Sequence, residues 1–106
     1  MNFGQALEAL KQGACVARAG WNGKGMWIAL TPGSEFPAVM AKPGHAAFSR
    51  ARELEEQHEE GEPEAPVVLL PHIDMRAADG SMVIGWLASQ TDMLAEDWMI
   101  VASATA

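Results

Sequence analysis

Residues 14–31, ACVARAGWNGKGMWIALT, contain two apolar runs that bracket a glycine-rich turn. The runs at 14–18 and 26–31 are long enough for strands, and the stretch 20–25 between them holds three glycines. Glycine in such a turn suits a positive φ angle or a close backbone approach. The pattern predicts a hairpin of two strands with aromatic and polar side chains at its tip.

A helix with one apolar face is expected before this hairpin. Asn2 and Gln5 have the spacing of a capping box, and Gly13 is a typical residue just past a helix end. Leu7 and Leu10 fall on one face of the segment between these signals. Together they predict a helix of about ten residues.

The stretch after the hairpin, about 35–66, changes in composition. It contains four prolines, and seven of the 14 acidic residues of the chain lie between residues 53 and 64. Within it, residues 45–60 are predicted to form a helix with a thin apolar stripe. We interpret 35–66 as an insertion and its acidic run as a solvated face rather than a cation site.

The remaining segments predict a second hairpin, a short helix and a final strand. Residues 67–76 and 82–87 read as strands joined by a turn at 78–81. Hydroxyl and acidic residues open a helix of little more than one turn at 89–95. Residues 97–102 then close the chain as a strand.

This order of elements predicts an α+β fold with a small, mostly antiparallel sheet, an N-terminal helix, a short helix near the C-terminus and a helical insertion. A chain of 106 residues can bury one real core and has little area for a second. We therefore expect a single domain, 1–106, with an insertion at about 35–66.

Composition excludes several classes of protein. No apolar run approaches the roughly 20 residues that span a bilayer, and the N-terminus lacks a signal-peptide pattern, so we expect a cytoplasmic protein without membrane contact. Cys15 is the only cysteine, which excludes an intramolecular disulfide. The net charge is −7, and the few cations are scattered. Polymeric nucleic acid is therefore not an expected partner, whereas a small anionic ligand remains compatible.

Catalytic signatures are missing from the sequence. An enzyme needs a nucleophile or a matched acid and base, and the chain contains no G-x-S-x-G, P-loop or dinucleotide fingerprint. The three histidines have no metal-ligand spacing. Asp74, Asp92 and Asp97 could form a carboxylate pair in space, but sequence cannot place them together. We expect no enzyme, no metal and no cofactor.

The most distinctive feature of the sequence is tryptophan next to polar residues. The chain has four tryptophans, three phenylalanines and no tyrosine. Trp27 and Trp98 lie in apolar strand segments and are expected in the core. Trp21, at the tip of the first hairpin, is either an interface anchor or a platform on which a nucleobase stacks.

Two segments could bind phosphate without many cations. Gly23-Lys24-Gly25 combines backbone N–H groups with one positive charge, and Ser89-Gln90-Thr91 combines hydroxyls with the free N–H groups of a helix start. Both segments are also ordinary turn and cap sequences. Spacing alone does not decide between these interpretations.

Three blocks of sequence resemble a phage and prophage family that includes the second type of Thoeris anti-defence protein. They are ARAGWNGKGM at 17–26, PHIDMR at 71–76 and WLASQTDMLAEDW at 86–98, in the same order as in the family. The opening NFGQAL, 2–7, is similar to the family start as well. The resemblance covers nearly the whole chain except the insertion.

The resemblance implies a sponge that binds and sequesters cyclic nucleotide immune signals without cleaving them. Its implied ligand is glycocyclic ADP-ribose, which the TIR enzymes of Thoeris defence make from NAD. Some family members also hold cyclic dinucleotides or trinucleotides of CBASS defence. The implied assembly is a homotetramer with ligand pockets at subunit interfaces.

The resemblance also implies roles for residues near the first hairpin. Trp21 would stack on adenine, while Asn22, Gly23 and Lys24 would shape the phosphate side of the pocket. Arg18 would close the pocket or, alternatively, pair with Asp74.

Further roles fall to the C-terminal half of the chain. Asp74 would accept ribose hydroxyls, and Ser89, Gln90 and Thr91 would donate to phosphate or ribose. Asp92, like Trp86, is expected to support the fold or the subunit interface.

Two other functions stay open. In the first, the chain is a protein-interaction module in which Trp21 anchors a partner protein and the acidic insertion mimics nucleic acid. In the second, it is a hydrolase of the same signals.

Overall fold

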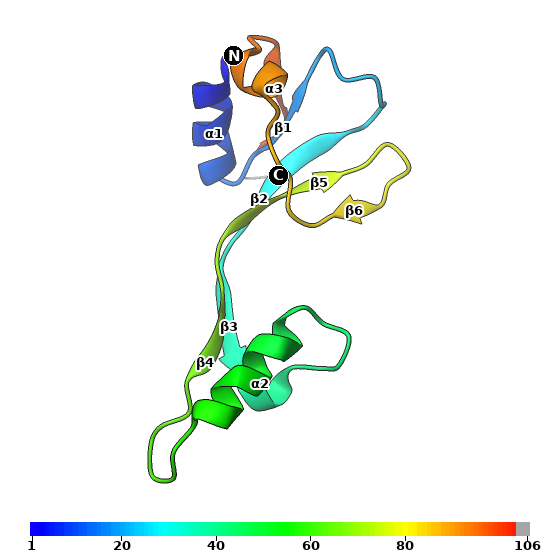
Figure 1. Cartoon of the computed structure of the whole chain (residues 1–106). Coiled ribbons are helices and arrows are strands. Elements are labelled where there is room, and N and C mark those ends of the chain that lie inside the picture. The colour runs from blue at the N-terminus through cyan, green and yellow to red at the C-terminus, as the bar shows by residue number, and fades with distance from the viewer. Residues whose placement is uncertain (104–106) are drawn as a thin grey trace. The chain divides into compact units, whose positions relative to one another are not determined.

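The computed structural model describes residues 1–103 of the chain. The chain forms two compact units (Figure 1). The first unit comprises Met1–Pro32 and the chain from Pro71 onward, and the second comprises Gly33–Leu70. Each unit has its own buried core. The predicted insertion at about 35–66 lies inside the second unit.

The first unit is built on a five-stranded antiparallel sheet with the strand order β6-β5-β2-β1-β7. Its strands are β1 (Cys15–Arg18), β2 (Trp27–Thr31), β5 (His72–Arg76), β6 (Met82–Val83) and β7 (Trp98–Ala102). Both predicted hairpins are present, as the β1–β2 and β5–β6 pairs. The α+β class is confirmed.

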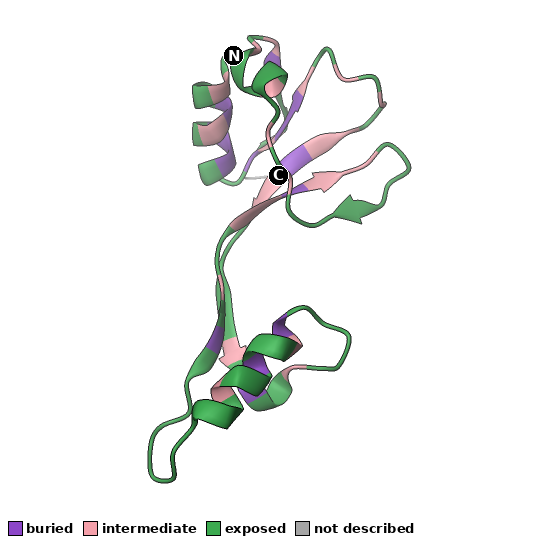
Figure 2. Cartoon of the chain, in the orientation of Figure 1, coloured by how far each residue is buried: buried purple, intermediate pink, exposed green. Residues whose placement is uncertain are grey.

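Helix α1 (Phe3–Lys11) covers one face of this sheet. Its N-terminus carries the predicted capping box, in which Gln5 N donates to Asn2 Oδ1 at 2.8 Å and Asn2 N donates to Gln5 Oε1 at 2.9 Å. Leu10 packs with buried strand residues, among them Val16 and Ile28. Figure 2 shows the buried positions of the chain in purple, on this helix and on the strands beside it. The helix thus buries its apolar stripe against the strands, which is the main source of its stability.

Strand alternation gives the sheet a second, outer face that α1 does not cover. Successive strand side chains point to opposite faces, so neighbours of the buried core residues point outward. Ala17 and Met99 are paired on this outer face, next to the pair of Val16 and Ile100. The outer face is therefore available for a site.

Helix α3 (Gln90–Leu94) is the predicted short helix near the C-terminus. Ser89 Oγ accepts from Asp92 N at 3.0 Å, and Ser89 N donates to Asp92 Oδ2 at 3.3 Å. This reciprocal capping box compensates for the few hydrogen bonds that so short a helix forms internally.

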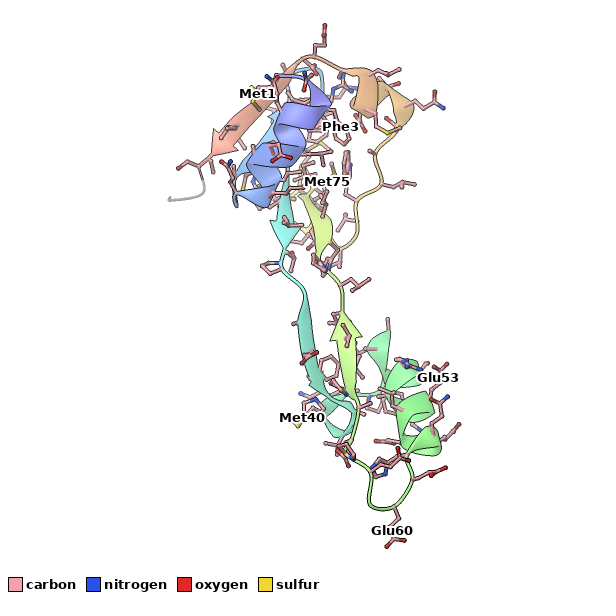
Figure 3. All side chains as sticks on the ribbon, turned by 90° about the vertical axis from the view of Figure 1, so that its left-hand side faces the viewer. Met1, Phe3, Met40, Glu53, Glu60 and Met75 are labelled. Atoms are coloured by element: carbon pink, nitrogen blue, oxygen red, sulfur yellow. The ribbon has the colours of Figure 1, made fainter. Side chains whose placement is uncertain are left out.

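The second unit pairs a two-stranded antiparallel sheet with one helix. Its elements are β3 (Ser34–Pro37), the 3-10 turn η1 (Ala38–Met40), α2 (Ala47–Gln57) and β4 (Pro66–Leu69). The predicted helix is confirmed in shorter form, and the acidic run is exposed, as at Glu53 and Glu60 (Figure 3). At 11 residues α2 is the longest described helix, and none in residues 1–103 is long and apolar enough to cross a membrane.

The prediction of a single strand at 67–76 is wrong. The structure has two strands there, and they belong to different sheets, because β4 pairs with β3 whereas β5 pairs with β2. The break falls at Leu70 and Pro71. Proline has no N–H to donate to a sheet ladder, so it suits the passage from one unit to the other.

The strand predicted at 82–87 is also shorter than expected. β6 ends at Val83, and Gly85 has φ +87° and donates its N–H to Asp74 Oδ1 at 2.8 Å. A positive φ angle is incompatible with a regular strand. The backbone therefore turns toward β5 here instead of continuing along it.

Candidate functional site

The outer face of the five-stranded sheet carries a pocket of about 270 Å³. Its lining comes from the end of β1, the following loop, the start of β2 and two residues of β7. The lining residues are 17–19, 21–27, Met99 and Val101. Every wall of this pocket belongs to the first unit.

The loop at residues 20–25, here called the tip loop, is held by hydrogen bonds at both ends. Gly20 N donates to Asp97 Oδ2 at 2.8 Å, and Arg76 Nη1 donates to the Gly25 carbonyl at 3.0 Å. Gly25 has φ +75°, and a Cβ there would lie 2.6 Å from Arg76 Nη1. Glycine is thus required at this position, and the loop is preorganised despite its composition.

Arg18 bridges two different carboxylates next to the tip loop. Its Nε donates to Asp97 Oδ1 at 2.8 Å, and its Nη1 donates to Asp92 Oδ1 at 2.9 Å. The alternative in which Arg18 pairs with Asp74 is therefore wrong. The guanidinium ties β1 to α3 and to the segment after it, and two carboxylates already engage its single positive charge.

The bridge keeps all three groups ionised. The hydrogen bond from Arg18 lowers the pKa of Asp97, and the Gly20 N–H adds to this effect. Burial by itself would raise the pKa of Asp92, but hydrogen bonds, led by that of Arg18, outweigh it and hold the pKa below its usual value. The same bonds raise the pKa of Arg18.

Trp21 is part of an aromatic cluster as well as a wall of the pocket. Its ring packs edge-on against Trp98, with centroids 5.4 Å apart, and against Trp86 at 6.4 Å. Its Nε1 donates to Asp92 Oδ1 at 3.3 Å. Asp92 therefore supports the fold, in agreement with its expected role, and orients Trp21.

The prediction that Trp27 lies in the core is wrong, whereas that for Trp98 is confirmed. Trp98 is buried in the core, but Trp27 is half-buried and lines the pocket. The cause is strand alternation, which turns Trp27 away from the side on which its neighbour Ile28 is buried. An apolar run in the sequence did not distinguish the two faces.

Several polar groups of the tip loop are free of partners inside the chain. Within residues 1–103, the side chains of Asn22 and Lys24 form no hydrogen bond or ion pair, and the backbone N–H groups of 22–25 donate to no protein atom. Met26 folds over Gly23, where a Cβ would lie 2.2 Å from the methionine sulfur. Successive free N–H groups beside a lysine suit an anion.

Comparison with known proteins identifies the family. The model of the Tad2-like family, described as the Thoeris anti-defense 2-like domain, matches residues 1–101. Thoeris anti-defense 2 of Bacillus phage SP01 is 37% identical over 102 residues, which cover 96% of each chain. The chain belongs to the Thoeris anti-defense 2-like family.

Family membership confirms the resemblance and gives the chain an anti-defence role. The family match runs through residues 33–70, which the three resembling blocks leave out. The second unit is thus part of the matched family domain.

Asp74 of this Thoeris anti-defense 2-like chain lies away from the pocket. It is only 3% exposed, accepts hydrogen bonds from the Thr31 hydroxyl and Gly85 N, and has the His72 imidazole at 3.4 Å. Burial by itself would raise the pKa of Asp74, but these partners outweigh it and lower the pKa. Its carboxylate joins β2 and β5 to the turn at Gly85.

Ser89, Gln90 and Thr91 are exposed at the start of α3 and are likewise absent from the described lining of the pocket. The Ser89 hydroxyl serves as the cap of α3. The pocket gathers five of the predicted site residues, which are Arg18, Trp21, Asn22, Gly23 and Lys24.

Besides Ala17 and Ala19, sequence reasoning missed four large side chains of the pocket wall, which are Met26, Trp27, Met99 and Val101. All four are apolar residues in predicted strands. Strand alternation could assign these residues to the outer face, but only after the pairing of β7 with β1 is known.

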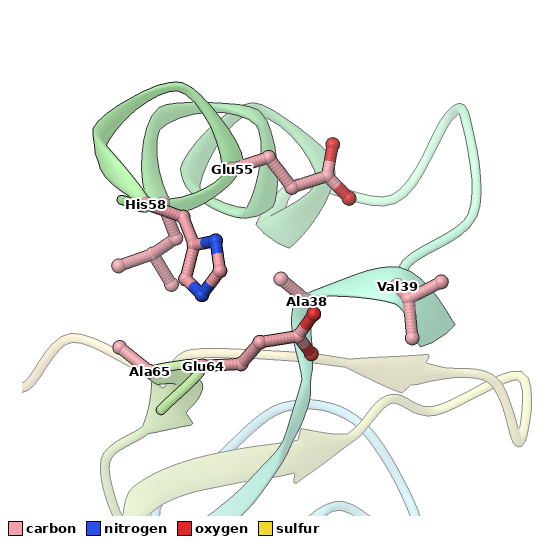
Figure 4. A pocket seen from close by; sticks show the side chains of 7 residues that line it. Ala38, Val39, Glu55, His58, Glu64 and Ala65 are labelled. Atoms are coloured by element: carbon pink, nitrogen blue, oxygen red, sulfur yellow. The ribbon is translucent and has the colours of Figure 1, made fainter. Parts of the chain in front are cut away.

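A second pocket, of about 100 Å³, lies within the second unit (Figure 4). The side chains of Glu55, His58 and Glu64 border it, together with apolar side chains that include Ala38 and Val39. Two carboxylates repel a phosphate, so this pocket does not suit an anionic nucleotide. In residues 1–103, no three His, Cys, Asp or Glu side chains are grouped to hold a metal ion.

Proposed function

We propose that this chain binds and sequesters, without cleaving it, the cyclic nucleotide signal of Thoeris defence, glycocyclic ADP-ribose. Removal of the signal inhibits the anti-phage response. The observation that carries the proposal is the pocket beside the tip loop, in a chain 37% identical to Thoeris anti-defense 2 of a phage. The pocket combines a preorganised donor loop with an aromatic wall.

The tip loop has the chemistry of a phosphate site. Within residues 1–103, the N–H groups at 22–25, the Asn22 side chain and the Lys24 ammonium are donors of the pocket wall that have no partner in the protein. Arg18 contributes a guanidinium that Asp92 and Asp97 already neutralise. We therefore assign phosphate binding to Lys24 and the loop backbone, with Arg18 holding the loop in place.

The aromatic wall has the chemistry of a nucleobase site. Trp21 and Trp27 are both half-buried and both line the pocket. A flat base gains roughly 1–3 kcal/mol from stacking on an aromatic side chain. Because the cluster with Trp86 and Trp98 fixes the Trp21 ring, little conformational entropy is lost on binding.

The composition of the pocket supports binding without cleavage. Its described lining contains no His, Cys, Asp or Glu side chain. General acid–base hydrolysis most often uses such groups, held within hydrogen-bonding reach of the ligand. Asp92 and Asp97, the two carboxylates that contact the pocket-lining Arg18, are engaged by its guanidinium.

The wider proposal follows the family resemblance. We infer that the chain acts as a homotetramer in the cytoplasm of the bacterial host and also binds cyclic dinucleotides or trinucleotides of CBASS defence. The exposed apolar side chains of Ile84, Leu87 and Leu94 are our candidates for the contacts between subunits.

Calorimetric titration with glycocyclic ADP-ribose tests the proposal. We expect saturable binding by the wild type and a loss of roughly tenfold in affinity for Lys24→Ala, since a charge-assisted hydrogen bond to phosphate is removed. Lys11→Ala is the matched control, because Lys11 is exposed on α1 and lies outside the pocket. A wild type that gives no binding heat and leaves the ligand free in solution would contradict the proposal.

A further inference from the structure

β7 contributes two side chains to the pocket that no sequence motif indicated. Met99 is 44% exposed and Val101 is 46% exposed, and both line the pocket beside the tip loop. β7 is the edge strand of the sheet. These side chains therefore keep a large apolar area in water when the pocket is empty.

Strand alternation places both side chains on the same face, because Met99 and Val101 are two residues apart in β7. A β-bulge lies at the same point: Val16 is paired with Ile100 and Cys15 with Ala102, so Val101 is its extra residue. Bulges re-aim side chains and are frequent beside functional sites. Ile100, opposite the buried Val16, lies on the α1 side of the sheet and is absent from the pocket lining.

The pocket thus has two chemically different walls. The tip loop supplies the Lys24 charge and the free N–H groups of 22–25, whereas β7 supplies only methyl, methylene and thioether groups. A phosphate placed against the β7 wall would lose its hydration without gaining a partner. A nucleobase or sugar face placed there would gain contact, and a methionine side chain adapts well to a flat ring.

We propose that Met99 and Val101 contact the nonpolar part of the ligand and fix its orientation, with the phosphates toward the tip loop. This assignment rests on the proposed function. Met99 and Val101 are specificity-determining residues: they favour ligands that carry an apolar base or sugar face next to their phosphates. Pyrophosphate alone would bind without using them.

The first test compares the double variant Met99→Ala/Val101→Ala with Ile100→Ala. Ile100 is the matched control, because it lies on the same strand at 51% exposure but on the other face. We expect the double variant to lose roughly tenfold or more in affinity for glycocyclic ADP-ribose, as removal of buried methyl and methylene groups does. Ile100→Ala should bind like the wild type. Near-ultraviolet circular dichroism checks that all three proteins are folded.

The second test needs no variant. Hydrogen peroxide oxidises exposed methionines to sulfoxides, and peptide mass spectrometry follows each residue separately. Bound glycocyclic ADP-ribose should slow the oxidation of Met99 severalfold, whereas pyrophosphate should not. Met82, 47% exposed and outside the pocket lining, is the internal control and should be oxidised at the same rate with and without ligand.

The outcomes separate this inference from the proposed function. If the wild type binds glycocyclic ADP-ribose but the double variant binds it with the same affinity, or if Met99 is not protected from oxidation, the inference is wrong and the proposed function stands. If the wild type does not bind the ligand at all, both are wrong. Weakened binding of the double variant together with protection of Met99 supports the inference.

Discussion

Trp21 has a structural role and a ligand-facing role at the same time. It packs edge-on against Trp86 and Trp98, donates to Asp92 and lines the pocket. A residue held from three sides presents a fixed surface to a ligand. The same contacts mean that a change at this position alters the stability of the first unit as well as binding.

Two substitutions of Trp21 separate these roles. We expect Trp21→Ala to abolish binding of glycocyclic ADP-ribose and to lower the free energy of unfolding by about 2 kcal/mol, less than the 3–5 kcal/mol typical of a fully buried tryptophan. Trp21→Phe should keep most of the stability, because an aromatic ring still fills the site. Chemical denaturation measures the free energy of unfolding, and calorimetry measures the binding of glycocyclic ADP-ribose. Full binding by folded Trp21→Ala would show that Trp21 is no part of the site.

At the level of elements, the ends of helices are where sequence reasoning succeeded most clearly. The capping box at Asn2 and the hydroxyl cap at Ser89 are local patterns, and both form as expected. Strand ends were harder, because Pro71 and Gly85 interrupt apolar runs for reasons set by distant partners. The Gly85 turn, for example, depends on a hydrogen bond to Asp74.

Ser89→Ala distinguishes a capping role from a ligand role. We expect the free energy of unfolding to fall by about 1 kcal/mol, because the Asp92 N–H at the start of α3 loses its acceptor. Affinity for glycocyclic ADP-ribose should stay unchanged, since the described pocket lining lacks Ser89. If the variant folds but binds the ligand more weakly, Ser89 is part of the ligand site. Ser81→Ala, in the turn after β5, is a control for loss of an exposed hydroxyl.

The candidate site was predictable only in part, because some of its residues come together only through the pairing of distant strands. The tip loop is contiguous in sequence, so Trp21, Asn22, Gly23 and Lys24 could be assigned to one site directly. Met99 and Val101 join them only through the pairing of β7 with β1 and the bulge between them. Such long-range register leaves no local trace in an apolar strand.

On the scale of the whole molecule, the chain divides into two units with separate cores. The strands that lead into and out of the second unit are already paired in the first, with Thr31 opposite His72. All residues that line the tip-loop pocket belong to the first unit. The first unit therefore contains a complete hairpin that a short turn could close.

Replacement of residues 32–71 by Asn-Gly tests the independence of the first unit. Asn-Gly favours the turn that joins two paired antiparallel strands. We expect the shortened chain to unfold cooperatively and to bind glycocyclic ADP-ribose with unchanged affinity. Thermal unfolding and calorimetry check this. A shortened chain that folds but no longer binds would place part of the ligand site in the second unit.

Three buried or half-buried carboxylates with lowered pKa values make the first unit sensitive to acid. Asp74, Asp92 and Asp97 have pKa values below their usual range in the folded chain, so in the unfolded chain they bind protons at a higher pH, near the ordinary aspartate pKa of about 4. Stability is therefore present in full above about pH 5 and falls as the pH drops below about 4.

Thermal unfolding between pH 7 and pH 3 measures this dependence. The melting temperature should be nearly constant down to about pH 5 and then decrease. Asp92→Asn should melt at a lower temperature near neutral pH and lose less on acidification, because one proton-linked group is gone. A wild-type melting temperature that rises on acidification would contradict the assignment of these carboxylates.

The central claim is that the chain captures its signal and leaves it intact. Purified protein is mixed with glycocyclic ADP-ribose, free ligand is removed by filtration, and the protein is boiled before mass-resolved chromatography of what is released. Our account predicts intact glycocyclic ADP-ribose in near-stoichiometric amount. An altered product would make the chain an enzyme, and an undepleted ligand would show that the tip-loop pocket serves another function.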